Sequence, residues 1–337
     1  MWTLTNRTPF AAGRNWVRDK EGVHYWVVAV GASFAIRVDG ALEREEKQLP
    51  PLLAPEYHGE PGTSSLRRDS DLLAVRPGTD LLLDAHAHAP GGRPAETVLT
   101  TLRVGALEKT VLVHGERRYD RTVAGGLGVT ATEPFVSKPI RYELAYGGWD
   151  KLDPDPRNHR LDARNPIGRG FAARSAHLLG QPVPATQYPD GDLAQRGPAG
   201  FGPIDRAWSP RRELAGTYDE AWSKSKKPLL ADDYDERFAL SAPADQQVIP
   251  HLRGGERVEL VNLSAAGRLT FELPRRYFTF TTRFGGRSEE HRGHLTTVFI
   301  EPEAPRVFLV WQTSLVVRPA DVDYLDTTAI GEKEYVR

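Results

Sequence analysis

The feature that most constrains this chain is an alternating apolar segment near its N-terminus, between residues 25 and 38. Every second residue there is apolar, and this set consists of Trp26, Val28, Val30, Ala32, Phe34, Ile36 and Val38. The intervening set is mixed, since it includes Gly31, Ser33 and Arg37. Successive side chains of a strand point to opposite faces, so this pattern predicts a half-buried β-strand. We expect Gly31 to mark either a β-bulge or a close approach of another segment.

Similar strand patterns fill the rest of the first third and the last third of the chain. The predicted strands are Leu81–Ala89, Val98–Val104, Leu107–Val113, Val258–Leu263, Arg268–Leu273, Tyr277–Phe284, Leu295–Glu301 and Arg306–Val317. Gly and Pro pairs separate them and act as turns. No long amphipathic helix and no repeat of fixed period is visible. The sequence therefore predicts a mainly β fold, with antiparallel sheets in a sandwich or a barrel-like arrangement.

The middle third is loop-rich, with short helices expected at Phe171–Leu179 and around Asp219–Lys224. Its many aromatic residues favour an ordered segment, because disordered linkers are poor in them. We expect an N-terminal β lobe (1–130), a loop-rich segment packed on the β core (131–247) and a C-terminal β lobe (248–337). The alternative is one continuous domain from about residue 20 to residue 317, since long ordered loops belong to the domain that they cover.

Charge and cysteine content exclude several classes of protein. The 44 basic and 45 acidic residues are interspersed, whereas nucleic-acid binders are strongly basic because phosphate neutralisation supplies much of their affinity. The absence of cysteine excludes disulfides, thiolate catalysis and cysteine-ligated metals. No signal-peptide pattern is visible, and the longest apolar run, Trp26–Ile36, is shorter than the about 20 residues of a membrane helix. We expect a cytoplasmic protein with no nucleic-acid or membrane partner.

One short motif invites a metal-site interpretation. Asp84, His86 and His88 alternate along a predicted strand and would share one face, where they could ligate zinc or iron. The alternative is a solvated strand face with the intervening leucines and alanines turned inward. That alternative explains every position, so we expect no metal and no other cofactor.

No other segment predicts catalysis. The acidic cluster 232–236 does not match a calcium-binding loop, and 165–171 lacks the Lys-Ser/Thr pair of a phosphate-binding loop. No serine lies in a nucleophile elbow. We expect a protein that is not an enzyme, with a metal-dependent enzyme built on Asp84, His86 and His88 as the weaker alternative.

A series of ordered motifs resembles a known bacterial family. The motifs occupy Phe135–Gly148, Asn165–Phe171, Pro198–Arg211, Gly216–Trp222 and Asp233–Phe238, followed by Asp245-Gln246-Gln247, Gly254-Gly255-Glu256, Asn262-Leu263 and Leu273-Pro274. In content and order they resemble the domain-of-unknown-function 2169 (DUF2169) family over nearly the whole chain. The departures are minor, such as Tyr146 and Tyr234 where the family has Phe.

The resemblance implies a role in type VI secretion. Members of the family look like adaptors or chaperones that bind a toxic effector and help load it onto the VgrG spike protein. The expected partners are therefore a secreted effector and VgrG, and no catalytic residue comes with the family. A structural accessory protein that stays with the spike is the alternative.

Five side chains of the middle third are candidates for holding such a partner, because Trp and Arg dominate interface energetics. They are Trp149, Arg169, Trp208, Arg211 and Trp222. The alternative for each of them is a structural role, in which it fixes a long loop to the β core.

Overall fold

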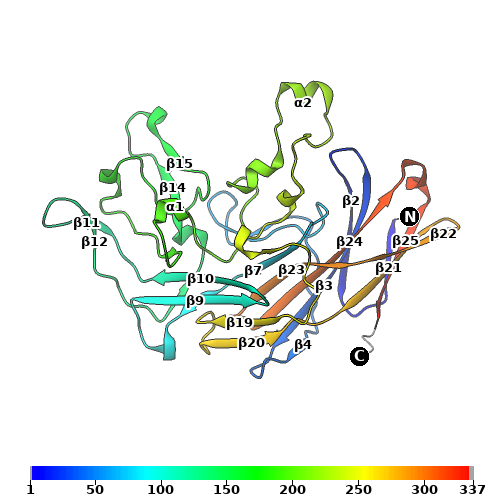
Figure 1. Ribbon diagram of the computed structural model, residues 1–337, viewed down its shortest axis with the longest axis horizontal. Coiled ribbons are helices and arrows are strands. Elements are labelled where there is room, and N and C mark those ends of the chain that lie inside the picture. The colour runs from blue at the N-terminus through cyan, green and yellow to red at the C-terminus, as the bar shows by residue number, and fades with distance from the viewer. Residues whose placement is uncertain (1, 334–337) are drawn as a thin grey trace.

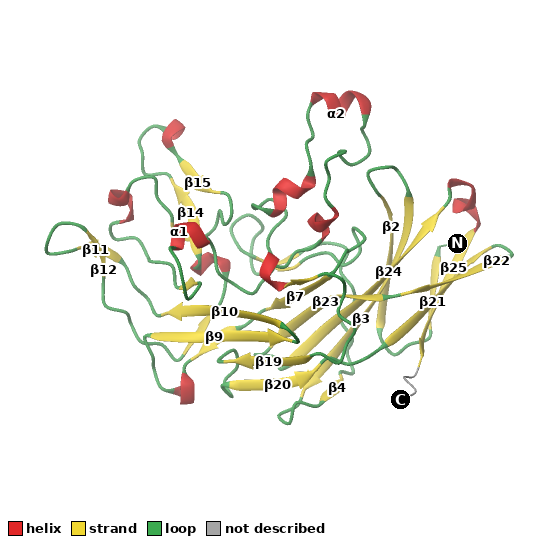
Figure 2. Ribbon diagram, viewed as in Figure 1, coloured by secondary structure: helices red, strands yellow, loops and turns green. Residues whose placement is uncertain are grey.

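The computed structural model describes residues 2–333 and is mainly β, as the sequence predicts (Figures 1 and 2). The largest sheet has seven strands. In order they are β18 (Gln247–Val248), β7 (Thr79–Leu83), β23 (His294–Glu301), β24 (Arg306–Val317), β3 (His24–Ile36) and β2 (Ala11–Arg18), with β4 (Leu42–Arg44) also paired to β3. Only the β7–β23 pair is parallel within this sheet.

Two smaller sheets complete the β core. The five-stranded sheet is antiparallel and contains β17 (Thr186–Gln187), β10 (Leu107–His114), β9 (Thr97–Val104), β19 (Arg257–Val261) and β20 (Arg268–Glu272). The four-stranded sheet contains β1 (Thr3–Asn6), β25 (Leu325–Lys333), β21 (Tyr277–Phe284) and β22 (Arg287–Arg292). Because β1 pairs with β25, the first and last described strands are neighbours.

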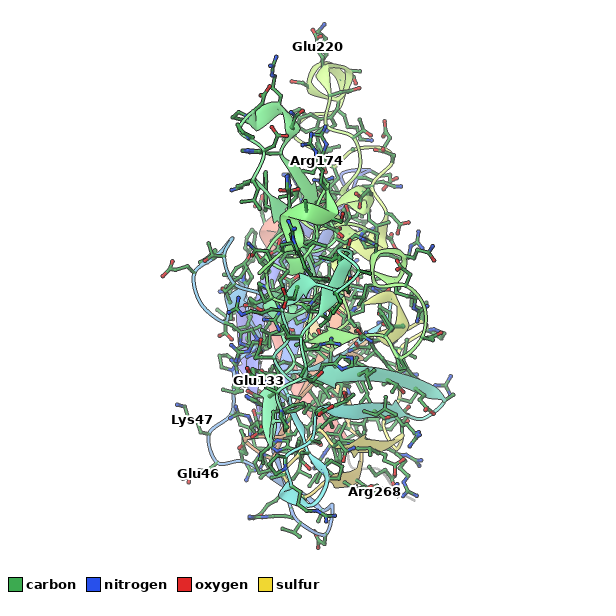
Figure 3. The ribbon with its side chains drawn as sticks, turned by 90° about the vertical axis from the view of Figure 1, so that its left-hand side faces the viewer. Glu46, Lys47, Glu133, Arg174, Glu220 and Arg268 are labelled. Atoms are coloured by element: carbon green, nitrogen blue, oxygen red, sulfur yellow. The ribbon has the colours of Figure 1, made fainter. Side chains whose placement is uncertain are left out.

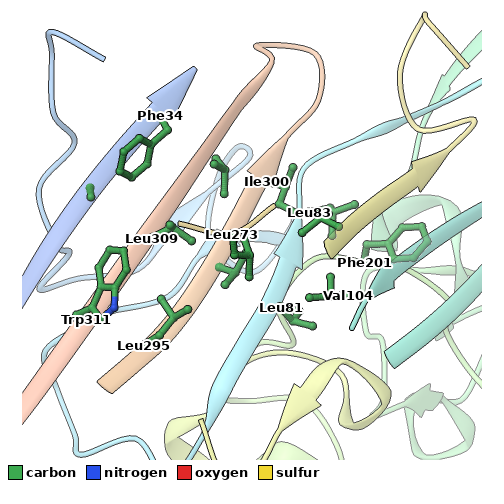
Figure 4. Packing of buried hydrophobic residues seen from close by; sticks show 14 of the residues in the cluster. Phe34, Leu81, Leu83, Val104, Phe201, Leu273, Leu295, Ile300, Leu309 and Trp311 are labelled. Carbon is green, nitrogen blue, oxygen red and sulfur yellow. The ribbon is translucent and has the colours of Figure 1, made fainter. Parts of the chain in front are cut away.

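The main hydrophobic core lies on one face of the seven-stranded sheet and draws side chains from all three sheets. Figure 4 shows part of it, where Phe34 and Leu309 lie on the same face as Leu83, with Val104 and Phe201 beyond. Burial of such apolar surface is the main driving force for folding. Strands from the expected lobes 1–130 and 248–337 share both larger sheets, since β7 pairs with β23 and β9 with β19.

The expectation that β3 is half-buried is wrong, because its second face is covered too. Val27 and Ala29 are fully buried in a second cluster with Leu72 and Phe308. Of the two roles expected for Gly31, close approach is the observed one: a Cβ there would lie 2.9 Å from ring atoms of Phe308 and 3.0 Å from the Leu49 carbonyl oxygen. Pairing of β3 with both neighbours runs through Gly31 without a shift, so there is no bulge.

The strand predicted at 81–89 is interrupted at Asp84. Its first part belongs to β7, and its second part, β8 (His86–His88), leaves the large sheet and pairs with β13 (Ser137–Pro139). Ala85, Ala87 and Ala89 are buried, as the inward-facing alternative for this segment predicts.

The loop-rich middle segment rises from one side of the sheets as two arms (Figures 1 and 3). The first arm (residues 141–197) carries β14 (Tyr146–Asp150), β15 (Arg160–Asp162), β16 (Arg169–Gly170) and α1 (Leu193–Arg196). The second arm (residues 205–240) carries α2 (Glu220–Ser225), which Asp219 caps, close to the helix predicted there. At 171–179 only a short 3-10 helix forms, Ser175–Leu178. In the segment between the two arms, Phe201 packs in the main core and is 1% exposed.

The remaining elements are short. The strands are β5 (Glu56–Tyr57), β6 (Leu66–Arg68), β11 (Tyr119–Arg121) and β12 (Leu127–Val129). The 3-10 helices are Pro90–Gly92, Tyr142–Leu144, Pro156–Asn158, Arg211–Ala215, Glu236–Ala239, Ala244–Gln246 and Pro319–Tyr324. Within residues 2–333, no helix has the length and apolar character needed to cross a membrane.

Candidate protein-binding groove

A groove of about 550 Å³ lies between the two arms. The first arm and the segment after it contribute one wall, and the second arm contributes the other. The floor includes the 3-10 helix Ala244–Gln246, which follows the second arm. Residues of three motifs that carry the family resemblance therefore meet here, from Pro198–Arg211, Asp233–Phe238 and Asp245-Gln246-Gln247. Arg164, which directly precedes the motif Asn165–Phe171, lines the groove as well.

The floor of the groove is tied to both large sheets. Lys109 of β10 donates from Nζ to Oδ1 of Asp245 at 2.8 Å. Gln246 donates from Nε2 to the carbonyl oxygens of Leu81 at 2.6 Å and Phe201 at 3.0 Å. Buried polar groups that are hydrogen-bonded in this way fix their element in place, because breaking the bonds would leave unsatisfied polar atoms.

The cation at the floor is unusually deep. Lys109 is 3% exposed, and burial lowers its pKa to about 8, against the opposing effect of Asp245. Tyr188 lies above it, with its ring 5.6 Å from Nζ and its hydroxyl donating to Oδ2 of Asp245 at 3.2 Å. Burial, helped by Asp245, raises the pKa of Tyr188, so its hydroxyl stays protonated and donates.

The wall formed by the first arm is basic and aromatic. The Arg196 guanidinium stacks over the Tyr188 ring at 4.4 Å. Arg164 is held by Asp162, which accepts from its Nε at 2.9 Å and from its Nη2 at 2.6 Å. These two arginine side chains remain 46% and 35% exposed, so both are accessible from the groove.

The opposite wall contains a buried arginine and an exposed one. Arg211 donates to Asp69 at 2.5 Å and to the carbonyl oxygens of Ile204 at 2.7 Å and Phe238 at 3.0 Å. Arg237 is 59% exposed and is paired with Asp235 on one edge of its guanidinium. Burial alone would raise the pKa of Asp69, but the nearby Arg211 and Arg206 outweigh it and lower the pKa.

The structure brings together only some of the five predicted binding residues. Trp149 and Arg169 border a separate cavity of about 250 Å³ on the first arm. Trp149 is 51% exposed and lies 4.6 Å from the Lys151 ammonium. Arg169 is mostly buried and pairs with Glu116 at 3.4 Å.

The other three predicted residues make structural contacts. Trp208 is 6% exposed and packs edge-on against Tyr142. Arg211, 4% exposed, ties the second arm to the core and contributes only a buried part of the groove wall. Trp222 donates from Nε1 to the Leu229 carbonyl oxygen at 2.9 Å and packs edge-on against Tyr218. For these three side chains the contacts support the structural alternative.

Asp84 has a different partner from His86 and His88. Asp84 accepts from Nε of Arg67 at 3.2 Å. His88 bonds Glu303 at 2.6 Å through Nε2, and His86 Nδ1 lies 3.9 Å from the same carboxylate. In the part of the chain that the structure describes, no three His, Asp or Glu side chains are grouped so that they could hold a metal ion.

Comparison with known proteins decides the family. A family model described as "Uncharacterized protein conserved in bacteria (DUF2169)" matches residues 21–312. The chain belongs to this family. The resemblance seen in the motifs is thereby confirmed, and the match includes both arms and the groove of this DUF2169 protein.

A curated relative adds no further information on function. Ribosomal RNA small subunit methyltransferase H of Frankia casuarinae is 31% identical over 113 residues. The DUF2169 chain spans a third of the length of that relative, and a third of the chain itself is matched. No solved structure matches the chain.

Sequence reasoning missed side chains that line the groove, and it missed Lys109, which is not part of the lining but holds the lining residue Asp245. Lys109 was detectable, because it shares the apolar face of a predicted strand with Val111 and Val113. Tyr188 and Arg196 lie in a loop without periodicity, and only the fold brings them beside Asp245.

Proposed function

We propose that this protein is a non-enzymatic adaptor of type VI secretion, which binds an effector in the cytoplasm and helps load it onto the VgrG spike. Membership of the DUF2169 family supports this role through the motifs that resemble effector adaptors. The supporting chemistry is that of an interface, since four arginines and one tyrosine line the groove, and arginine and tyrosine are enriched at binding surfaces.

The observation that carries the proposal is the groove between two loop arms on a rigid β core. Binding residues are commonly placed on loops that a scaffold positions. Here the scaffold fixes the floor through Lys109 and Gln246, and the wall through Arg211. A site held in this way loses little conformational entropy when a partner binds, so more of the contact energy contributes to affinity.

Co-expression with an effector encoded beside the gene tests the role. We expect a stable complex that co-elutes on gel filtration and that forms a ternary complex when VgrG is added. If no neighbouring effector or spike protein is retained, the adaptor role is refuted.

Two further measurements separate the alternatives. An adaptor that stays in the cell should be absent from the secreted fraction when the apparatus fires, whereas detection there would favour a structural accessory of the spike. Metal analysis of protein purified after metal-replete growth tests the metal-dependent enzyme, for which a stoichiometric metal content is required.

A further inference from the structure

We propose that the groove between the arms is the effector-binding site, and that its occupant is an extended, acidic segment carrying apolar side chains. This inference rests on the proposed adaptor function and names both the surface and the chemistry of what binds it. The binding chemistry depends on the charges, the free edges of the arginines and the apolar lining of the groove.

The charge of the lining is one-sided. Its residues include four arginines and one acidic residue, Asp245. That one carboxylate is already paired with the buried Lys109 and accepts from Tyr188. The carboxylates that pair with these arginines lie outside the lining, and they are Asp162, Asp190, Asp69 and Asp235. The surface that faces the groove therefore carries the arginines and not their partners. Such a surface favours an anionic occupant, because complementary charge steers a partner to a site and suppresses wrong ones.

Two of the arginines, Arg164 and Arg237, have N–H groups that their carboxylate partners do not use. Asp162 uses Nε and Nη2 of Arg164, and Asp235 uses the same two atoms of Arg237. A guanidinium carries five N–H groups, so each of these pairs leaves Nη1 for a second carboxylate. The Arg237–Asp235 pair is largely exposed, and exposed ion pairs contribute little to stability, so its geometry can adjust to a ligand at small cost. Asp162 is buried and holds Arg164 in place.

The larger apolar residues that line the groove are Pro198, Ile204, Pro210, Leu214, Leu240 and Pro243, and Ser209 and Gln247 are polar exceptions. A volume of about 550 Å³ is far larger than one carboxylate needs, and it lies in the range of sites that enclose a sizeable ligand. An extended segment that alternates acidic and apolar side chains would satisfy both kinds of lining.

A synthetic peptide tests this chemistry directly. The probe is a fluorescein-labelled peptide of alternating Glu and Leu, and its counterpart has Lys in place of Glu. By fluorescence anisotropy we expect the acidic peptide to bind, to weaken as salt is added, and to bind at least about tenfold more tightly than the Lys peptide. Absence of binding by the acidic peptide, or equal binding of both, overturns the inference.

Charge reversal locates the site. Arg196→Glu with Arg237→Glu should weaken binding of the acidic peptide at least about tenfold. The matched control, Arg283→Glu with Arg292→Glu, changes the net charge equally on exposed positions of β21 and β22, outside the groove lining, and should bind as the wild type does. Arg196→Gln with Arg237→Gln provides a milder pair should the reversal disturb folding. Equal loss in the groove variants and the control would overturn the inference.

The effector complex separates this inference from the adaptor function. If wild-type protein retains the effector and the groove variants retain it equally well, the groove assignment fails while the adaptor function stands. If the acidic peptide competes with the effector for the wild-type protein, the groove assignment and the adaptor function are both supported. If neither the wild-type protein nor any variant retains an effector, the adaptor function fails, and the peptide measurements alone decide whether the groove takes an acidic segment.

Discussion

Buried charged side chains hold the loop segment to the sheets, and each depends on a specific partner. Arg211 with Asp69 and Lys109 with Asp245 are the two pairs that anchor the walls and floor of the groove. Removing one member of such a pair is strongly destabilising when the charge left behind is buried, and it costs much less when that charge can be solvated. The two single variants of such a pair, one at the cation and one at the carboxylate, should therefore differ in their free energy of unfolding.

For the pair at the floor of the groove, we expect Asp245→Ala to lower the free energy of unfolding by about 1–2 kcal/mol at pH 7, because a lysine with a pKa of about 8 can lose its proton at pH 7 at a cost of about 1.4 kcal/mol. Lys109→Met should change it by less than about 1 kcal/mol, because Asp245 is 40% exposed and can be solvated. Urea unfolding of both variants measures the difference. A larger loss in Lys109→Met than in Asp245→Ala would contradict this account.

The same pair predicts a dependence on pH. Burial lowers the pKa of Lys109 to about 8, below its value in the unfolded chain, so the cost of burying the cation is fully present below pH 8 and disappears as pH rises toward the ordinary lysine value. The destabilisation caused by Asp245→Ala should accordingly be smaller at pH 9.5 than at pH 7, because Lys109 of the folded wild type is then largely neutral as well. Unfolding curves at the two pH values test this, and a constant difference would count against the assignment.

Arg211 should not tolerate lysine. Its guanidinium reaches Asp69 and two carbonyl oxygens at once, which a single ammonium cannot do, so Arg211→Lys should cost about 2 kcal/mol. The neighbouring Arg212 is 58% exposed and provides the control, since Arg212→Lys should stay within about 0.5 kcal/mol of wild type. Chemical unfolding compares them, and equal effects would refute the structural role of Arg211.

At the scale of elements, periodicity predicted the positions of most long strands well, but it did not predict which of their faces other segments cover. The strands predicted at 98–104, 107–113 and 277–284 differ from those observed by at most one residue at either end. The second covered face of β3 was missed because its cover, including Leu72, comes from a loop without a pattern of its own. β2 and β25 were also missed, since glycine, charged and small polar residues interrupt their alternation.

The candidate site shows the same limit. The sequence directed attention to the segment that forms the groove, since the arms carry the motifs. Residue type alone did not separate Trp208, which is buried, from Trp149, which is exposed, because tertiary packing decides exposure. The groove joins residues from 164 to 247 with a lysine at 109, a combination that only the folded chain reveals.

Gly31 provides a test of packing within an element. A Cβ at this position would meet the Phe308 ring at 2.9 Å, so Gly31→Ala should destabilise the protein by about 1–3 kcal/mol through overpacking. Gly286→Ala in the β21–β22 turn is the control, because a methyl group there would have no neighbouring atom within 4 Å. Thermal unfolding followed by circular dichroism measures both, and equal melting temperatures would refute the close contact at Gly31.

At the scale of the whole molecule, both ends of the chain build the same sheets. A fragment of residues 1–130 would lack β23 beside β7 and β19 beside β9, and would expose core side chains such as Leu81 and Leu102. We expect this fragment to stay unfolded and the full chain to unfold in one cooperative step. Circular dichroism and tryptophan fluorescence should give coincident transitions, whereas two resolved transitions would indicate independent lobes.

The position of β3 in the large sheet has a consequence for how the protein is made. This strand is synthesised long before its neighbour β24, because both arms lie between them in the sequence. A long apolar strand with one edge unpaired is prone to aggregation, so the nascent chain carries this hazard until β24 has been made. The groove also depends on β7, whose partner β23 likewise follows both arms. The protein can therefore take up a partner only after β23 and β24 have been synthesised.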